Sequence, residues 1–365
     1  MRTVALDARL TRQMSVGMQA YVRELVTRMP RRAGDLRFIV YGNEPIPGLA
    51  DTVEFRSLGR AAAVNGGLGE QFSLPRTLGS SDADLIHHMS VYAPRAASYP
   101  HVYTIHDLIH LRFPQYFSWK IPPYYRFVVG PVARSARCVI TDARATVADL
   151  SEYLRVPSER ARVVPLGVDE AFSLDESERM ACAADAAQRF GLDRPYFVYA
   201  GNHRPHKNIA TLVEAWRMTN GGCDLVLTEE GPFGFSLDVG PKRNGRILPT
   251  GRISQEELVA LYAGCAAAVQ PSLYEGFGLG ALEAMAAGAP AIVARTPALV
   301  ELTGGAALTF EPLDAHELAR HLDAMLADPS LWPKLRGSGR ARARDFSWDR
   351  TAELTTQVYR ETLAC

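Results

Sequence analysis

Short apolar runs alternate with helical patterns along almost the whole chain of 365 residues. Apolar runs at residues 4–6, 38–41, 85–88, 102–105, 138–141 and 163–165 alternate with amphipathic stretches such as residues 19–26. The same pattern resumes at residues 196–200, 224–227, 267–270 and 290–294. Regular alternation of this kind is typical of parallel β-sheets with crossover helices. We therefore expect an α/β fold built from Rossmann-like, doubly wound units.

The length of the chain suits two domains of ordinary size, each with its own core. The division is expected near residues 170–178, after the segment Leu166-Gly167-Val168-Asp169. We predict an N-terminal domain over residues 1–172, a second domain over residues 173–347 and a final helix over residues 348–365. Two such domains facing each other would leave a cleft bordered by the carboxyl ends of strands, where α/β sheets bind ligands.

Composition narrows the class of protein. Apolar residues make up 47% of the chain and charged residues 22%, which is ordinary for a globular protein. No stretch approaches the roughly 18 apolar residues that span a bilayer. Asp7 interrupts the first apolar stretch, which therefore predicts a buried strand and not a signal peptide. The five scattered cysteines include no C-x-x-C pair, which favours reduced thiols in a cytoplasmic protein.

Charge is distributed unevenly. Residues 1–170 hold 21 Lys and Arg against 16 Asp and Glu, a difference of +5. This bias favours an anionic partner such as a phospholipid surface or a lipid-diphosphate acceptor, and it is too weak to indicate nucleic acid. Residues 119–126 mix aromatic and basic side chains, a pattern that fits either a membrane contact or the entry to a core-facing helix.

The segment 271–286 carries the strongest chemical signal. Glu275 and Glu283 stand eight positions apart, with Gly276, Gly278 and Gly280 between them, where an apolar strand gives way to an Ala-rich helix. Unpaired N–H groups and the dipole at a helix start favour an anion such as phosphate. The glycines allow close approach of a ligand to the backbone. We expect Glu275 on the loop and Glu283 in the first helical turn, accepting hydrogen bonds from hydroxyls, so the segment indicates a sugar nucleotide.

Four more blocks accompany this segment in order: Thr104-Ile105-His106-Asp107-Leu108, Val164-Pro165-Leu166-Gly167-Val168-Asp169, Gly201-Asn202-His203-Arg204-Pro205-His206-Lys207-Asn208 and Phe346-Ser347-Trp348. Together they resemble the retaining glycosyltransferases of family four, with their E-x7-E signature. The resemblance implies the GT-B fold, two facing Rossmann-like domains with a cleft between them. The Pro-His-Lys-Asn run is similar to the mannosyltransferases that build polysaccharides and lipopolysaccharides.

The resemblance also implies roles for individual residues. Lys207 would neutralise the donor diphosphate, Glu283 would bind the ribose, Glu275 would lie near the transferred sugar, and His106 would lie beside that sugar. The predicted catalytic residues are thus His106, Lys207 and Glu275. The predicted donor-binding set is Gly17, Gly201, Lys207, Arg252, Gly276, Phe277, Gly278, Leu279 and Glu283. The predicted acceptor-side residues are His87, His88 and Asp107. The alternative interpretations are that Lys207 is an ordinary surface lysine, that Glu275 caps the following helix, and that the histidines are hydrogen-bonded in the core.

The resulting hypothesis is a cytoplasmic retaining hexosyltransferase, and a peripheral contact with the inner membrane face stays open beside a core-facing helix over residues 119–126. It would move a hexose from a nucleoside diphosphate to a saccharide or lipid-linked acceptor, with GDP-mannose as the first guess for the donor. The nucleotide sugar is a co-substrate, and no further cofactor or metal is expected. Two alternatives stay open: a GT-B sugar-nucleotide 2-epimerase and a sugar-binding protein without catalytic activity.

Overall fold

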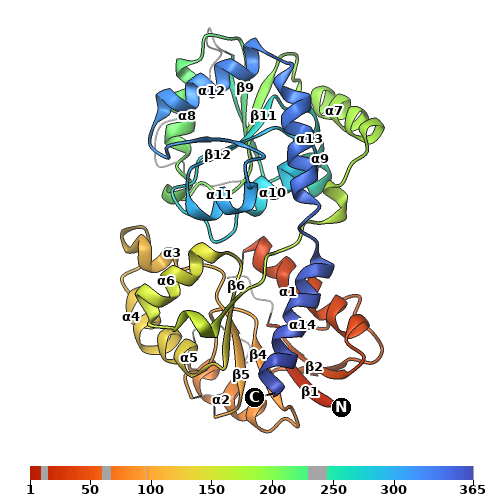
Figure 1. Cartoon of the computed structure of the whole chain (residues 1–365), viewed down its shortest axis with the longest axis vertical. Coiled ribbons are helices and arrows are strands. Elements are labelled where there is room, and N and C mark those ends of the chain that lie inside the picture. Colours follow the sequence, from red (N-terminus) through yellow and green to blue (C-terminus); the bar gives the residue numbers. More distant parts are fainter. Residues whose placement is uncertain (10–14, 60–66, 97, 229–244, 365) are drawn as a thin grey trace. The chain divides into compact units, whose positions relative to one another are not determined.

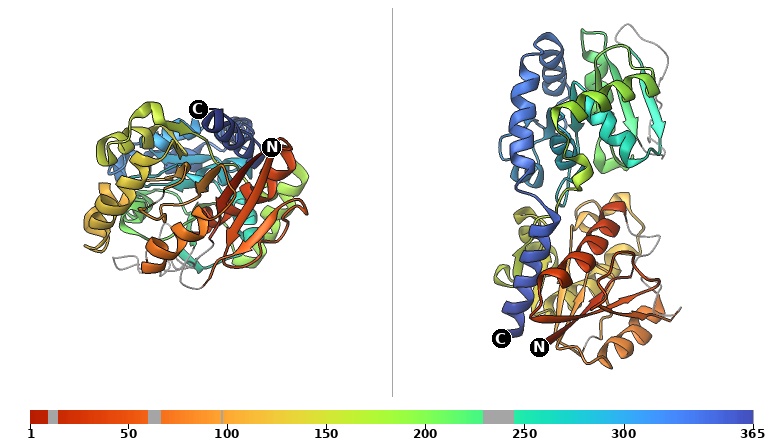
Figure 2. Two further views of the ribbon diagram at one scale, coloured as in Figure 1. Left: turned by 90° about the horizontal axis from the view of Figure 1, so that it is seen from below. Right: turned by 90° about the vertical axis from the view of Figure 1, so that its right-hand side faces the viewer.

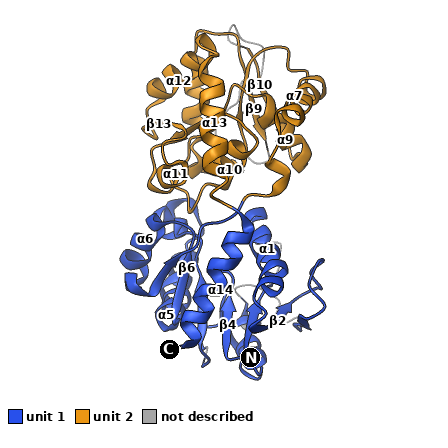
Figure 3. Cartoon of the chain, turned by 45° about the vertical axis from the view of Figure 1, so that its right-hand side comes forward, with its two compact units in different colours: residues 1–167, 347–365 blue, residues 168–346 orange. Residues whose placement is uncertain are grey.

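The computed structural model describes the whole chain apart from residues 10–14, 60–66, 97, 229–244 and 365. The chain forms two compact units, drawn in separate colours in Figure 3. Unit 1 contains Met1–Gly167 and Ser347–Cys365, and unit 2 contains Val168–Phe346. The second unit therefore interrupts the sequence of the first. Each unit is built around one parallel sheet, which confirms the predicted α/β class.

The sheet of unit 1 has seven strands in the order β3-β2-β1-β4-β5-β6-β7, and all of its pairs are parallel. The strands are β1 (Arg2–Asp7), β2 (Leu36–Gly42), β3 (Glu54–Ser57), β4 (Leu85–His88), β5 (His101–Thr104), β6 (Cys138–Thr141) and β7 (Ala161–Val163). β4, β5 and β6 are buried along their full length, and β1 and β2 at all but one position each, because helices cover both faces.

The crossover helices of unit 1 follow the strands in turn. They are α1 (Val16–Arg32), α2 (Leu68–Gly79), α3 (Ile109–Arg112), α4 (Ile121–Tyr124), α5 (Gly130–Ser135) and α6 (Arg144–Leu154), with short helical turns at Pro114–Tyr116, Tyr125–Val129 and Ser158–Arg160. The final helix, α14 (Trp348–Ala364), also belongs to this unit and packs beside α1, as Figures 1 and 2 show.

One glycine makes the return of the chain to unit 1 possible. Gly167 lies against the backbone at the start of α14, and a Cβ at this position would stand 2.1 Å from the backbone nitrogen of Trp348. No side chain fits into that space. Close packing therefore explains why the Leu-Gly-Val-Asp block has a glycine at position 167.

The sheet of unit 2 has six parallel strands in the order β10-β9-β8-β11-β12-β13. The strands are β8 (Tyr196–Tyr199), β9 (Asp224–Thr228), β10 (Ile247–Gly251), β11 (Ala267–Gln270), β12 (Ala291–Ala294) and β13 (Leu308–Phe310). The order reverses between β8 and β11, because the chain adds β9 and β10 on one side and β11 to β13 on the other. Such a reversal opens a crevice at the carboxyl ends of the strands, where α/β sheets bind ligands.

The helices of unit 2 are α7 (Glu176–Phe190), α8 (Ile209–Met218), α9 (Gln255–Gly264), α10 (Leu279–Ala286), α11 (Pro297–Thr303), α12 (Ala315–Ala327) and α13 (Leu331–Ala343), with turns at Glu170–Phe172 and Pro205–Lys207. Local sequence explains several of their ends. Asp175 with Glu178, and Ser254 with Glu257, form reciprocal capping boxes. Gly191 ends α7 in the left-handed conformation, at φ 60°.

Among the described residues, no helix combines the length and the apolar character that a membrane crossing requires.

Candidate active site

The loops that follow β8 and β11 lie together at the reversal point of the unit 2 sheet. The Leu273 backbone N–H donates to the carbonyl of His206 at 2.8 Å. Asn208, which has φ 57°, donates its side-chain amide to the carbonyls of Pro271 and Pro312 at 3.1 and 2.6 Å. These bonds tie residues 205–208 to the segments after β11 and β13. Asn208 belongs to a predicted motif, but this tethering function was not predicted from the sequence.

The tethered loops bring together the two predicted catalytic residues of unit 2. The Lys207 ammonium donates to Glu275 Oε1 at 2.7 Å, and Gln270 Nε2 donates to the same oxygen at 2.7 Å. The side chains of Lys207 and Glu275 are 16% and 12% exposed, so the pair is accessible but largely desolvated. Burial by itself would raise the pKa of Glu275, but the charge and hydrogen bond of Lys207 bring this pKa below its usual value.

The helix that follows this pair begins at a position that only glycine fits. Gly278 is the N-cap residue of α10, with φ 106°, and a Cβ there would stand 2.6 Å from the Leu299 side chain. Phe277 is buried against Phe346, whereas Gly276 and Leu279 are half-buried. The start of α10 has no side-chain cap, and the Ala281 and Leu282 N–H groups donate to the Gly278 carbonyl at 3.0 and 3.1 Å. The predicted glycine-led start of the helix is therefore present.

Glu283 lies one turn further into α10 than we predicted. The helix begins at Leu279, so Glu283 is its fifth residue and opens the second turn. Burial, with a smaller contribution from the negative charge of Asp169, raises the pKa of Glu283 to about 8. The carboxyl group is thus largely protonated at neutral pH. Asp169, in the Leu-Gly-Val-Asp block, is the neighbour whose influence the sequence did not reveal.

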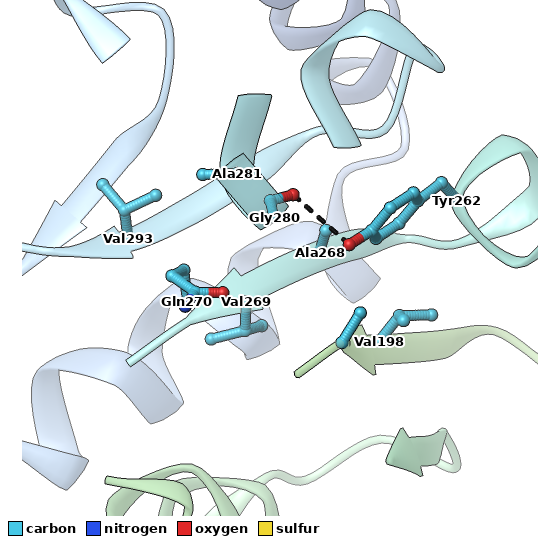
Figure 4. Close-up of a pocket in the computed structure, with 9 residues that line it drawn as sticks. Val198, Tyr262, Ala268, Val269, Gln270, Gly280, Ala281 and Val293 are labelled. Atoms are coloured by element: carbon cyan, nitrogen blue, oxygen red, sulfur yellow. Dashed lines mark hydrogen bonds between the residues drawn. The ribbon is translucent and has the colours of Figure 1, made fainter. Parts of the chain in front are cut away.

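A small pocket lies behind the start of α10 (Figure 4). Its lining is largely apolar and includes Val198, Ala268 and Val293, with Gln270 at one side. Tyr262 donates its hydroxyl to the carbonyl of Gly280 at 3.3 Å. A Cβ at position 280 would make only ordinary contacts, at 3.5 Å or more. Gly280, unlike Gly278, is therefore not required by packing.

Three other predicted donor-binding residues lie at strand or helix ends. Gly201, with φ 142°, follows β8, and the exposed Arg252 follows β10, which is one of the two edge strands of the unit 2 sheet. Gly17 is the second residue of α1 in unit 1, where the Ser15 side chain caps the helix by accepting from the Met18 N–H. This cap starts the helix at Val16, so Gly17 lies in its first turn.

In unit 1, His106 follows β5 and lies beside Asp142, which follows the neighbouring strand β6. His106 Nδ1 donates to Asp142 Oδ2 at 2.8 Å, and the two side chains are 12% and 2% exposed. Asp107 is partly buried and caps the next turn by accepting from the Ile109 N–H at 3.0 Å. The sequence assigned Asp142 no role. Asp142 could have been recognised as a neighbour of His106, because it directly follows β6, the strand next to β5.

His87 and His88, predicted on the acceptor side, are both fully buried in unit 1. His87 lies 2.6 Å from the Tyr359 hydroxyl of α14 and 2.7 Å from the Thr104 hydroxyl. Burial lowers the pKa of His87 to about 3, so this ring is neutral. His88 Nδ1 donates to Asp7 at 2.9 Å. The structure therefore places both histidines in the core, the alternative considered for such residues.

Together, two Rossmann-like units, a glycine-led helix start and a lysine–glutamate pair at a strand reversal are characteristic of nucleotide-sugar transferases with the GT-B fold. The family models for "Glycosyltransferase Family 4" and "Glycosyl transferases group 1" match residues 16–172 and 183–344. The chain belongs to the family-four glycosyltransferases, as the sequence motifs indicated.

Curated relatives indicate which branch of the family the chain resembles. The O-antigen chain mannosyltransferase B of Escherichia coli is 29% identical over 271 residues, which cover 71% of this chain and 70% of that protein. The MMP alpha-(1->4)-mannosyltransferase of Mycolicibacterium hassiacum is 32% identical over 260 residues, which cover 67% and 60%. For the serotype-specific mannosyltransferase WbdA of Escherichia coli, at 26% identity, the match covers 71% of this chain and 33% of that protein. The predicted resemblance to mannosyltransferases is confirmed.

Solved structures share the fold over the full length. Anabaena Alr3699/HepE in complex with UDP has a TM-score of 0.74 at 17% identity, covering 99% of this chain and all of that chain. WaaG, a glycosyltransferase involved in lipopolysaccharide biosynthesis, has a TM-score of 0.71 at 16% identity, covering 98% and 99%. At these identities the likeness establishes the GT-B fold alone.

Proposed function

We propose that this glycosyltransferase moves a hexose, with retention, from a nucleoside diphosphate sugar to a saccharide or lipid-linked acceptor. The observation that carries the proposal is the Lys207–Glu275 pair beside the Gly278 helix start. An ammonium ion and unpaired N–H groups suit a diphosphate. The three mannosyltransferase relatives named above support a mannosyl donor, and we propose GDP-mannose as the first one to test.

The chemical work of the site is to stabilise charge. As the bond from the anomeric carbon to the diphosphate breaks, the leaving group gains negative charge. Lys207 and the N–H groups at the start of α10 are held in place before the reaction, so they stabilise this charge with little reorganisation. Glu275 restricts the conformations of the Lys207 side chain, and it would lie near the cationic sugar. His106 is proposed to contact the same sugar.

A direct test measures donor use and the need for an acceptor. We expect the protein to bind GDP, UDP or dTDP selectively in calorimetry, and to transfer sugar from the matching donor to a saccharide acceptor. Among the described residues no group of three His, Cys, Asp or Glu side chains could hold a metal ion, and Lys207 can supply the positive charge instead. Turnover should therefore continue in excess EDTA. Donor conversion to a 2-epimer without any acceptor would instead support the epimerase alternative.

Glu283 provides a prediction about pH. If its carboxylate accepts hydrogen bonds from the ribose diol, nucleotide binding favours the ionised form. The free protein holds a proton there up to about pH 8, so binding at pH 7 should release a proton and affinity should rise as pH approaches 8. Calorimetry in buffers of different ionisation enthalpy measures the released proton.

The matching variants are Glu283→Gln and Glu283→Ala. Both should abolish the proton release and weaken nucleotide binding by about 10 to 150-fold, because a charged acceptor is lost. The exposed Glu256 of α9 is a control, since Glu256→Gln should change neither quantity. Unchanged affinity in the Glu283 variants would assign this residue a structural role.

We further propose a peripheral contact with an anionic membrane face, where lipid-linked acceptors reside. Trp119, Phe127 and Tyr116 of unit 1 are 79%, 54% and 39% exposed. Lys120 and Arg126 lie over the Trp119 and Phe127 rings, at 5.9 and 5.4 Å from the ring centroids. Residues 108–137 carry five Lys and Arg and no Asp or Glu. Exposed aromatic side chains beside basic side chains suit a lipid interface.

The variant Trp119→Ala/Phe127→Ala tests this contact. Inserting each ring contributes about 1.5 kcal/mol or more, so the double variant should bind vesicles of phosphatidylcholine with phosphatidylglycerol at least about 100-fold more weakly. Phe72→Ala, which removes a 61% exposed aromatic ring of α2, is the control. Equal sedimentation of the double variant and the control with these vesicles would rule out the contact.

A further inference from the structure

His106 is held on one side by a carboxylate from the neighbouring strand. The strands β5 and β6 are parallel neighbours, paired at Thr104 and Ile140, so the residues just beyond their carboxyl ends lie side by side. His106 therefore reaches Asp142, with 2.8 Å between Nδ1 and Oδ2. The Asp142 side chain is 2% exposed and has little freedom to turn away.

An aromatic ring holds the imidazole on a second side. The Tyr21 ring meets the His106 ring edge to face, with centroids 4.7 Å apart and an interplanar angle of 87°. Tyr21 is in turn fixed by a 2.9 Å hydrogen bond between its hydroxyl and that of Thr104. Thr104 also lies 2.7 Å from His87, which contacts Tyr359 of α14. The chain of contacts locks the orientation of His106.

The other ring nitrogen is left for a ligand. His106 Nε2 has no hydrogen-bond partner within the described part of the chain, and neither does Asp142 Oδ1. Burial alone would lower the pKa of His106, but the charge and hydrogen bond of Asp142 raise it above the usual value, with a smaller contribution from Asp107. The other groups around the ring are His87, which is neutral, and Tyr21, whose pKa is raised by burial.

We propose that Asp142 is a positioning residue that fixes the orientation of His106 and favours its imidazolium form, so that Nε2–H donates a hydrogen bond to oxygen atoms of the sugar nucleotide. This inference rests on the proposed function, in which His106 contacts the donor. Asp142 itself touches no substrate and acts through the imidazole. The arrangement follows the general logic in which a buried carboxylate orients a functional histidine.

The pairing is tested by NMR on the full-length protein labelled with ¹⁵N, with His106→Asn used to assign the ring signals. In the unaltered protein Nδ1 should stay protonated across the titration. In Asp142→Asn the charge is lost while the shape is kept, so His106 should titrate at lower pH. An unchanged titration would overturn the proposal, because a merely structural Asp142 leaves the imidazole unaffected.

Kinetics supply the second readout. Asp142→Asn should lower kcat about 10 to 100-fold, the range typical of partners that orient a functional histidine, with little change in the donor KM. The matched control is Asp149→Asn, which alters another buried carboxylate of unit 1 that contacts Arg112. A kcat for Asp142→Asn equal to that of the control would also overturn the proposal. If the unaltered protein transferred no sugar, the proposed function would fail, while the NMR titration would still decide the pairing.

Discussion

Replacement of Lys207 by alanine is expected to lower kcat by about 10² to 10³-fold, comparable to the loss of one oxyanion donor. The nucleoside diphosphate is already anionic, so donor binding should weaken as well. The larger effect falls on the chemical step, because the diphosphate gains charge as its bond to the sugar breaks. Lys207→Arg should restore activity only in part, since a planar guanidinium does not place its charge where the compact ammonium does.

The measurement is kcat at saturating donor, on protein whose thermal unfolding is checked beforehand. This check matters because Lys207→Ala also leaves the 12% exposed Glu275 without its cationic partner. Lys334→Ala, which alters an exposed lysine of α13 in the same unit, is the matched control. A kcat for Lys207→Ala within about threefold of this control would show that Lys207 does not stabilise the leaving group.

Arg9→Met should reduce the free energy of unfolding by about 3 to 5 kcal/mol. Arg9 is 3% exposed and donates to Asp7 at 2.7 Å and to Glu70 at 3.3 Å. It also donates to the Tyr92 carbonyl at 2.6 Å. Removing the guanidinium leaves the two buried carboxylates without their shared cation, although each keeps other hydrogen bonds.

Two comparisons sharpen this test in urea unfolding. Arg2→Met breaks an ion pair with Asp84 whose partners are 64% and 30% exposed, so it should cost less than about 1 kcal/mol. Burial opposes ionisation of Asp7, but Arg9 and His88 hold its pKa well below the usual range. This carboxylate therefore contributes stability above about pH 4 that is lost as pH falls further. Equal effects of the Arg9 and Arg2 substitutions at pH 7 would contradict the buried cluster.

The inner elements of both sheets could be predicted closely from the sequence. Residues 138–141 and 267–270 are strands β6 and β11 with the predicted bounds. Buried parallel strands must be apolar throughout, so their sequences stand out. The strands β3, β10 and β13 were not predicted. They lie at sheet edges, are partly exposed, and in β10 include Pro249, so they show no continuous apolar run.

The motifs of the donor site were also visible in the sequence, because their chemistry is local. Gly278 and the helix start after it follow from one short segment. The contacts of these motifs were not visible. Lys207 and Glu275 are 68 residues apart, and they meet because β8 and β11 are neighbours at the reversal of the sheet. His87 is separated by 272 residues from Tyr359, whose hydroxyl it contacts in the core.

The sequence by itself determined the α/β class, the division into two Rossmann-like units and the residue types available for binding a sugar nucleotide. These properties depend on periodicity and on short motifs, which are read along the chain. The tertiary structure alone decided which charged groups are paired and which are protonated: Glu275 is ionised beside Lys207, Glu283 holds a proton, and Asp142 holds His106. The physical reason is that a pKa depends on burial and on charges a few ångströms away, and distant segments supply both.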